Sequence, residues 1–314
     1  MVRIAFFGTP DFAVPTLRQL LDSPHPVVAV VTQPDRPRGR GQRVSESPVK
    51  ALAQARGLPV LQPSRLREPE FVEALRALQP DLGVVAAYGK LLPEDVLSLP
   101  RHGMINVHAS LLPKYRGAAP VHRAVIDGEA ETGVTIMRME KMLDSGPMLA
   151  KVKRPIGPNE TSDVVERDLA ELGADLLVRI VDQIDAGVHQ EELQDFMLCS
   201  YAPRLTKEEG LIDWTLPASY IHNRVRGLYP WPHAYTFLNG VRLIILQTHV
   251  EDSHTDAPPG AIVTSSRDSL HVATGHGGRI AIDRVQLEGG KPLEIREFLA
   301  GHRIATGARM GDGR

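Results

Sequence analysis

Short apolar runs alternate with helical patterns along the first part of the chain, and no other feature of the sequence limits the fold as strongly. Runs typical of buried strands occur as RIAFFG, VVAVVTQ, LGVVAAYG and MINVH at residues 3–8, 27–33, 82–89 and 104–108. Leucines at helical spacing lie between the first two runs, and Ser47 with the proline after it marks the start of another helix, which ends at Gly57. This alternation predicts a doubly wound α/β sheet, in which ligands bind beyond the carboxyl ends of the strands.

The pattern continues past the fourth strand and changes after residue 205. Further strands are expected at 132–139 and 147–156, followed by a long amphipathic helix that ends near Gly187. The Asn239-Gly240 pair predicts a tight hairpin, and several short strands follow it at small intervals. We therefore expect an α/β domain with a parallel-rich sheet over 1–205 and a small β-barrel domain over 206–314.

The composition indicates a globular chain without a global excess of charge. Its 314 residues include 36 Lys and Arg against 38 Asp and Glu, so a nucleic-acid partner would have to be bound by local patches. The single cysteine, Cys199, excludes an internal disulfide, and aliphatic runs such as VVAVV are too short to span a bilayer. Because Asp11 interrupts the apolar stretch that a signal peptide needs, we expect a cytoplasmic protein without a membrane partner. We also expect the protein to be a monomer.

Two common classes of site lack their sequence signals. The segment FFGTPDFAV has one glycine where the G-x-G-x-x-G loop of dinucleotide enzymes has three. The 12 histidines and one cysteine do not occur at the paired spacings of a zinc site, so no metal is expected.

Asn106 and His108 close the fourth strand. Side chains two residues apart point to the same face of a strand, so both polar groups lie side by side at the edge where ligands bind. An amide can stabilise a developing oxyanion, and an imidazole, which changes its protonation state near neutral pH, can move a proton. The pair is either a catalytic site or an ordinary polar strand end.

A loop rich in arginine leaves the carboxyl end of the second strand. DRPRGRGQR, at 35–43, contains one acid and is interrupted by proline and glycine. It begins at the edge where ligands bind, which favours contact with a polyanion over a merely solvated loop. The residues expected to contact the polyanion are Arg36, Arg38, Arg40 and Arg43.

Longer segments carry a resemblance to a known family. INVHASLLPKYRGAAP and the later LDSG resemble the formyltransferases that use 10-formyltetrahydrofolate. Further segments resemble, in sequence and in order, the family of these formyltransferases that formylates methionyl-tRNA. These segments are FFGTPDFAVPTL, TQPDRPRGRGQ, SPVKALA, AAYGKLLP, ETGVTIMRM, KEEGLIDW and PWPHA. The sequence departs from the usual family pattern at Ala109, Met142, Ser145 and Pro147.

This resemblance implies a fold, a reaction and a site. The fold is a Rossmann-like formyltransferase domain followed by an OB-like β-barrel. The reaction transfers the formyl group of 10-formyltetrahydrofolate, a cosubstrate, to the free amine of methionyl initiator tRNA, without a metal. The catalytic trio of the family corresponds to Asn106, His108 and Asp144. The implied folate contacts are Tyr88, Gly89, Leu92, Ser110, Leu111, Leu112 and Pro113.

Several of these residues also have a purely structural explanation. Asp144 lies in an Asp-Ser-Gly segment typical of turns, and Tyr88 is equally explained by core packing. Tyr115 and Arg116 either contact a ligand or lie in solvent. Two other functions fit parts of the sequence: a formyltransferase acting on a UDP-linked amino sugar, and a non-catalytic RNA-binding protein, which would not need the catalytic trio.

Overall fold

A computed structural model describes residues 1–38 and 43–311, which form two compact units. The first unit comprises Met1–Pro120, Glu131–Arg154 and Glu166–Ala202. The second comprises Val121–Ala130, Pro155–Val165 and Pro203–Arg314. The second unit therefore takes in two segments that lie within residues 1–205.

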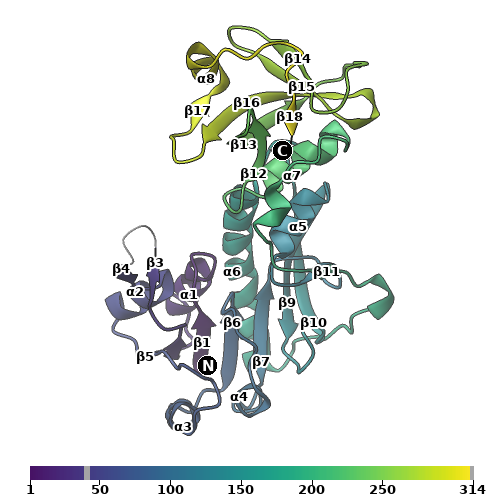
Figure 1. The fold of residues 1–314 in the computed structure, drawn as a ribbon. Helices are drawn as coiled ribbons and strands as arrows, with labels where there is room; N and C mark the ends of the chain where they lie inside the picture. The colour runs from purple at the N-terminus through teal and green to yellow at the C-terminus, as the bar shows by residue number, and fades with distance from the viewer. Residues whose placement is uncertain (39–42, 312–314) are drawn as a thin grey trace. The chain divides into compact units, whose positions relative to one another are not determined.

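A seven-stranded sheet forms the centre of the first unit (Figure 1), in the order β10-β9-β7-β6-β1-β2-β5. The strands β5, β2, β1, β6 and β7 are parallel, and β9 runs antiparallel to β7. Their bounds are β1 Ile4–Gly8, β2 Val27–Val31, β5 Val60–Leu61, β6 Leu82–Ala86, β7 Met104–His108, β9 Glu131–Arg138 and β10 Met148–Pro155. The predicted parallel-rich α/β sheet is confirmed.

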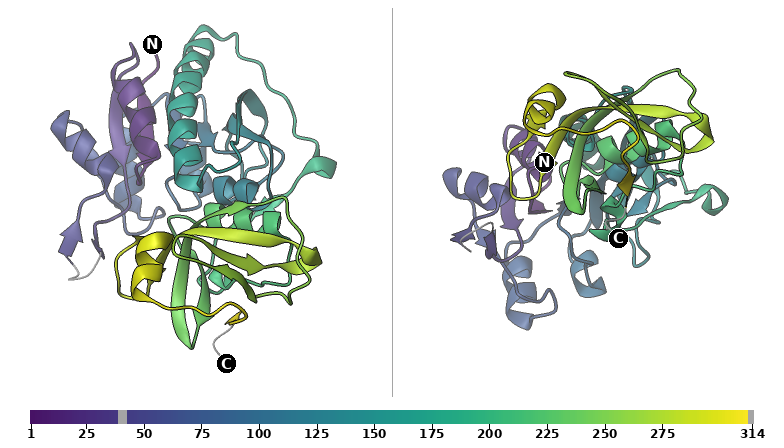
Figure 2. Two further views of the ribbon diagram at one scale, coloured as in Figure 1. Left: turned by 90° about the horizontal axis from the view of Figure 1, so that it is seen from above. Right: turned by 45° about the horizontal axis from the view of Figure 1, so that its top comes forward.

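Helices pack on both faces of this sheet. On one face, α1 (Ala13–Leu21) and the long α6 (Ser162–Ala186) lie side by side (Figure 2), and a hydrogen bond of 3.0 Å joins Gln19 to Asp175. α2 (Pro48–Ala55) begins at Ser47, whose hydroxyl accepts the Lys50 amide, as its sequence predicts. α3 (Pro69–Ala77) and α4 (Glu94–Leu97) pack their apolar side chains into a core with residues of β1, β2 and β6.

Short strands outside the main sheet extend toward the carboxyl edge of the parallel strands. β3 (Arg36–Arg38) and β4 (Arg43–Ser45) pair as an antiparallel hairpin. β8 (Arg116–Gly117) pairs in parallel with β11 (Tyr201–Ala202), which follows a single 3-10 turn at Phe196–Leu198.

The second unit is built on a curled antiparallel sheet that forms a half-barrel. Its strands follow the order β14-β15-β16-β13-β12-β18, and β17 also pairs with β16. Asn239 and Gly240 adopt positive φ angles of 52° and 77° at the β12–β13 turn, which confirms the predicted hairpin. The strands are β12 Ala234–Leu238, β13 Val241–Val250, β14 Ile262–Ser265, β15 Leu270–Ala273, β16 Arg279–Leu287, β17 Leu293–Glu294 and β18 Met310–Gly311.

Helices complete the second unit. α7 (Ala218–Gly227) lies where a helix-like segment is expected from the sequence, and it packs against β13. The sequence did not predict α5 (Pro120–Ile126) or α8 (Ile295–Gly301), which begins with a capping box between Glu294 and Glu297.

Candidate active site

Asn106 and His108 lie at the carboxyl end of β7, on one face of the sheet. Their cross-strand neighbours on β9 are Met137 and Thr135, which face the same side. His108 is buried, with 5% of its surface exposed, whereas Asn106 is partly exposed. Within the described part of the chain, the side-chain amide of Asn106 has no hydrogen-bond partner, and the residue is partly exposed.

A loop between β9 and β10 brings Asp144 to His108. The Asp144 Oδ2 lies 3.7 Å from His108 Nδ1 and accepts a hydrogen bond of 2.8 Å from the Gly117 amide. Asp144 adopts a positive φ of 48°, an uncommon conformation in which Asp and Asn are enriched among residues other than glycine. Both side chains of the pair are largely buried, at 6% and 11% exposure, so water screens their interaction only weakly.

The second ring nitrogen of His108 has a different partner. Its Nε2 lies 2.9 Å from the carbonyl oxygen of Tyr115, and since a carbonyl only accepts hydrogen bonds, Nε2 must carry the proton. In a neutral ring Nδ1 is then an unprotonated base next to the Asp144 carboxylate. The site thus contains a base whose protonated form would be stabilised by an adjacent negative charge.

The segment after His108 is folded back on itself. The Ser110 hydroxyl donates to the Lys114 carbonyl over 2.6 Å, and Ser110 is completely buried. Leu112 packs with Met137 and Met148, while Leu111 and Pro113 are partly buried. Ser110 and Leu112 therefore shape the loop, and of the four predicted folate contacts here only Leu111 and Pro113 have exposed side-chain surface.

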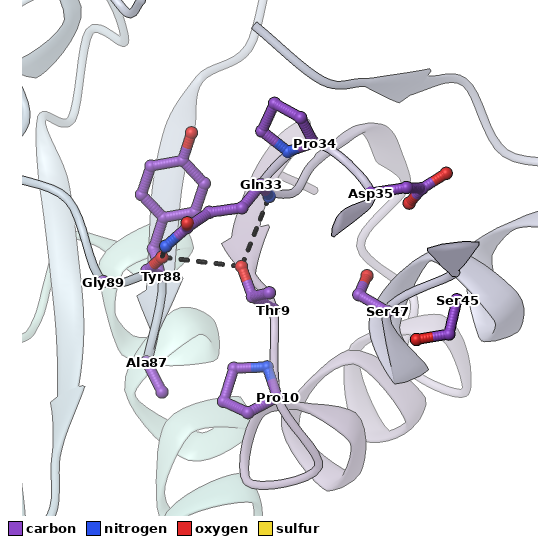
Figure 3. Close-up of a pocket in the computed structure, with 10 residues that line it drawn as sticks. All are labelled: Thr9, Pro10, Gln33, Pro34, Asp35, Ser45, Ser47, Ala87, Tyr88 and Gly89. Carbon is purple, nitrogen blue, oxygen red and sulfur yellow. Dashed lines mark hydrogen bonds between the residues drawn. The ribbon is translucent and has the colours of Figure 1, made fainter. Parts of the chain in front are cut away.

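A pocket of about 300 Å³ opens beside the ends of β1, β2 and β6. Figure 3 shows Thr9 between Gln33 and Tyr88: the Thr9 hydroxyl accepts from the Gln33 amide over 3.3 Å and lies 3.5 Å from the Tyr88 carbonyl. A Cβ on Gly89 would lie 2.8 Å from the Gln33 side chain, so glycine allows this close approach. The lining residues are Thr9, Pro10, Gln33, Pro34, Asp35, Ser45, Ser47, Ala87, Tyr88 and Gly89.

Two predicted folate contacts on the segment after β6 are buried side chains. Tyr88 is 1% exposed, packs edge-on to Phe7, and has a hydroxyl without a hydrogen-bond partner among the described residues. Burial raises the pKa of Tyr88 to about 12. Leu92 belongs to the same core, so both contribute chiefly to packing, and Tyr88 also lines the pocket.

The arginine-rich loop is the β3–β4 hairpin. Arg36 and Arg38 lie on β3 and Arg43 on β4, whereas Arg40 lies outside the described residues. The hairpin starts at Asp35, whose carboxylate is 2.5 Å from Lys50 Nζ and also accepts from Gln62. The Lys50 hydrogen bond, followed by that of Gln62, lowers the pKa of Asp35.

Arg116 neither lies in solvent nor is exposed to a ligand, so both expectations for it are wrong. It is 1% exposed, donates two hydrogen bonds of 3.0 and 2.7 Å to Gln194 Oε1, and lies over the Phe196 ring at 4.6 Å. Sequence reasoning missed the Tyr115 carbonyl and the Gly117 amide, which bind His108 and Asp144, because main-chain donors and acceptors carry no residue-specific signal.

Comparison with known proteins decides the family. The chain matches the formyl transferase family over residues 2–181 and the formyl transferase C-terminal domain over residues 204–303. Methionyl-tRNA formyltransferases of Geobacter sulfurreducens and Geotalea daltonii are 49% and 48% identical to it over 99% of this chain and 97% and 98% of theirs. The chain belongs to the methionyl-tRNA formyltransferase family. The predicted family is therefore confirmed, and with it a transferase activity.

The fold of this family member is shared more widely. The N-formyltransferase of Helicobacter canadensis, solved with folinic acid and dTDP-3-aminofucose, covers 90% of this chain and 99% of its own with a TM-score of 0.69 and 16% identity. At that identity the likeness concerns the fold alone. Over residues 1–38 and 43–311, no helix is long and apolar enough to cross a membrane, and no group of three His, Cys, Asp or Glu is arranged to hold a metal ion.

Proposed function

We propose that this chain transfers the formyl group of 10-formyltetrahydrofolate to the α-amine of methionine on initiator tRNA, with Asn106, His108 and Asp144 as its catalytic residues. The observation that carries the proposal is the identity of 48–49% to methionyl-tRNA formyltransferases along almost the whole chain, across both compact units. The contact between His108 and Asp144 at the carboxyl edge of the sheet supplies suitable chemistry.

The reaction requires no net gain or loss of protons. The methionine amine attacks the formyl carbon, a C–N bond forms, and the carbonyl oxygen gains negative charge in a tetrahedral intermediate. The bond from this carbon to N10 of the folate then breaks, the amine loses a proton and N10 gains one. The free donors of Asn106 suit the developing oxyanion, since hydrogen bonds that strengthen as charge develops lower the barrier.

His108 transfers the proton between the two nitrogens. The Tyr115 carbonyl holds a proton on Nε2, so Nδ1 takes the proton of the attacking amine. The Asp144 carboxylate, 3.7 Å from Nδ1, stabilises the imidazolium until the proton passes to N10. One ring nitrogen is thus fixed by the backbone and the other acts on the substrate.

The pocket and the hairpin offer places for the tRNA end. The pocket is lined by hydroxyl and amide groups of Thr9, Gln33 and Ser47, which suit a ribose or base edge, and it also includes Tyr88 and Gly89, which we expect to contact the folate. The arginine hairpin leaves this pocket at Asp35 and returns to it at Ser45, so Arg36, Arg38 and Arg43 lie on strands next to the pocket, and Arg40 belongs to the same stretch of sequence. We assign the phosphates of the acceptor strand to these arginines.

A direct assay tests the proposal. The purified chain is given 10-formyltetrahydrofolate with methionyl initiator tRNA, methionyl elongator tRNA or a nucleotide-linked amino sugar, and formyl transfer is followed with each. We expect transfer to the initiator tRNA, preference over the elongator, and none to the sugar. Transfer only to the sugar would favour an amino-sugar formyltransferase, and tRNA binding without transfer would favour a non-catalytic RNA-binding protein.

A further inference from the structure

Gln194 bridges a buried arginine and the loop that carries Asp144. Its Oε1 accepts both hydrogen bonds from Arg116, and its Nε2 donates to the carbonyls of Asp144 and Gly146 over 2.9 and 2.8 Å. Gln194 is 5% exposed and Arg116 is 1% exposed. The two Arg116 bonds and the bond to Gly146 are buried, and the bond to Asp144 is partly buried. Polar groups buried here without these partners would be destabilising.

These partners allow only one orientation of the Gln194 amide. A guanidinium only donates hydrogen bonds and a backbone carbonyl only accepts them, so turning the amide over would break every bond it makes. Arg116 itself lies on β8, which pairs with β11. The strand β11 follows the segment that contains Gln194, so the pairing keeps the two side chains together. The amide is thus oriented by a guanidinium that offers only donors.

Gln194 binds the carbonyl of Asp144 itself and that of Gly146, two residues later in the same loop. Asp144 has the uncommon φ of 48°, a conformation that persists only where the surrounding structure fixes it. From this geometry we infer that Gln194, oriented by Arg116, is a positioning residue that sets the direction of the Asp144 carboxylate toward His108. No local sequence pattern indicates this role, because 50 residues separate Gln194 from Asp144.

The isosteric variant Gln194→Glu tests the inference. Its carboxylate can still pair with Arg116 but sets an oxygen against two carbonyl oxygens, which turns two attractive contacts into repulsive ones. We expect kcat to fall about tenfold or more with little change in KM, since a displacement of about 1 Å can cost about 100-fold. Gln190→Glu, on the exposed neighbouring part of the same segment, introduces the same charge and should leave kcat unchanged.

A double-mutant cycle separates positioning from a general structural role. If Gln194 acts through Asp144, Gln194→Glu should cost less than about twofold in a chain that already carries Asp144→Asn. Equal losses in both backgrounds would overturn the inference. If Gln194→Glu shows no cooperative unfolding transition, the same cycle is run with Gln194→Met, which removes the bonds without adding charge and must show the same lack of additivity.

A spectroscopic measurement keeps this inference separate from the proposed function on which its kinetics rest. The imidazole ¹⁵N signals of His108 should shift in Gln194→Glu in the same direction as in Asp144→Asn, and should not shift in Gln190→Glu. If the unmodified chain does not formylate methionyl-tRNA, the proposed function fails while this shift still tests the positioning role. Unchanged His108 signals in Gln194→Glu would overturn the inference whatever the activity.

Discussion

Replacing Asp144 by Asn removes one charge from the site and leaves its shape intact. The Asn oxygen can still accept the Gly117 amide, and Asn tolerates the positive φ of 48°. Two unit charges about 4 Å apart attract by about 1 kcal/mol in water and about 4 kcal/mol at the effective dielectric of a protein. The separation of 3.7 Å and the exposures of 6% and 11% place His108 and Asp144 toward the larger value.

That energy is the stabilisation which the imidazolium loses in the transition state. Since each 1.36 kcal/mol is a factor of ten in rate, we expect Asp144→Asn to lower kcat by about 100- to 1000-fold and to leave the KM for tRNA and folate nearly unchanged. Steady-state formylation of methionyl initiator tRNA measures both constants. Asp195→Asn removes an equal charge from an exposed turn where Asn caps equally well, and serves as the control. A loss below tenfold in Asp144→Asn would refute the assigned role.

Three further experiments test other parts of the molecule. Replacing Arg36, Arg38 and Arg43 by Ala should raise the KM for tRNA most at low salt and leave the KM for folate unchanged. The slope of log affinity against log salt should flatten by up to about one unit per lost phosphate contact. An unaltered slope would exclude the hairpin from tRNA binding. Burial lowers the pKa of His222, so the folded chain binds a proton less readily than the unfolded chain, and its free energy of unfolding should fall as the pH drops below about 6.5. Denaturant titrations at about pH 7.5 and 5.5 should show a smaller drop in His222→Gln, and an equal drop would contradict this cause. The buried Tyr88 hydroxyl lacks a partner among the described residues, so Tyr88→Phe should not lower the unfolding temperature. Because the pKa of Tyr88 is about 12, the same variant should leave the absorbance titration of phenolate unchanged below about pH 11. A clear loss of stability would show that the hydroxyl is satisfied.

The strands of the main sheet can be predicted from the sequence because the signals that mark them are local. β1, β2, β6 and β7 are apolar runs between breakers, and α2 starts at the Ser47-Pro48 pair that its sequence predicts. The turn at Asn239 and Gly240 is likewise dictated by two neighbouring residues. Elements such as β18, whose two residues pair with β12 far back in the chain, have no periodicity to detect.

The residues of the site differ in the same way: some are marked by local sequence, and others meet only through tertiary structure. Asn106 and His108 are visible because strand geometry relates residues two positions apart, whereas the approach of Asp144 to His108 depends on a loop and entered only through the family resemblance. Arg116 was misjudged because a charged side chain is seldom fully buried without a partner, and its partner Gln194 lies 78 residues away. Contacts of this length depend on tertiary structure.

The same contacts explain why the loop around Asp144 tolerates departures from the family pattern. Pro147 contributes its carbonyl to the Arg138 amide over 2.8 Å and needs no N–H of its own, while the Ser145 hydroxyl turns back to the Met142 carbonyl. Gly146 has no such freedom, because a Cβ there would lie 2.1 Å from the Arg138 carbonyl oxygen. The Gly117 amide and the Gln194 side chain therefore hold the Asp144 segment, and none of these bonds involves the side chain of Ser145 or Pro147.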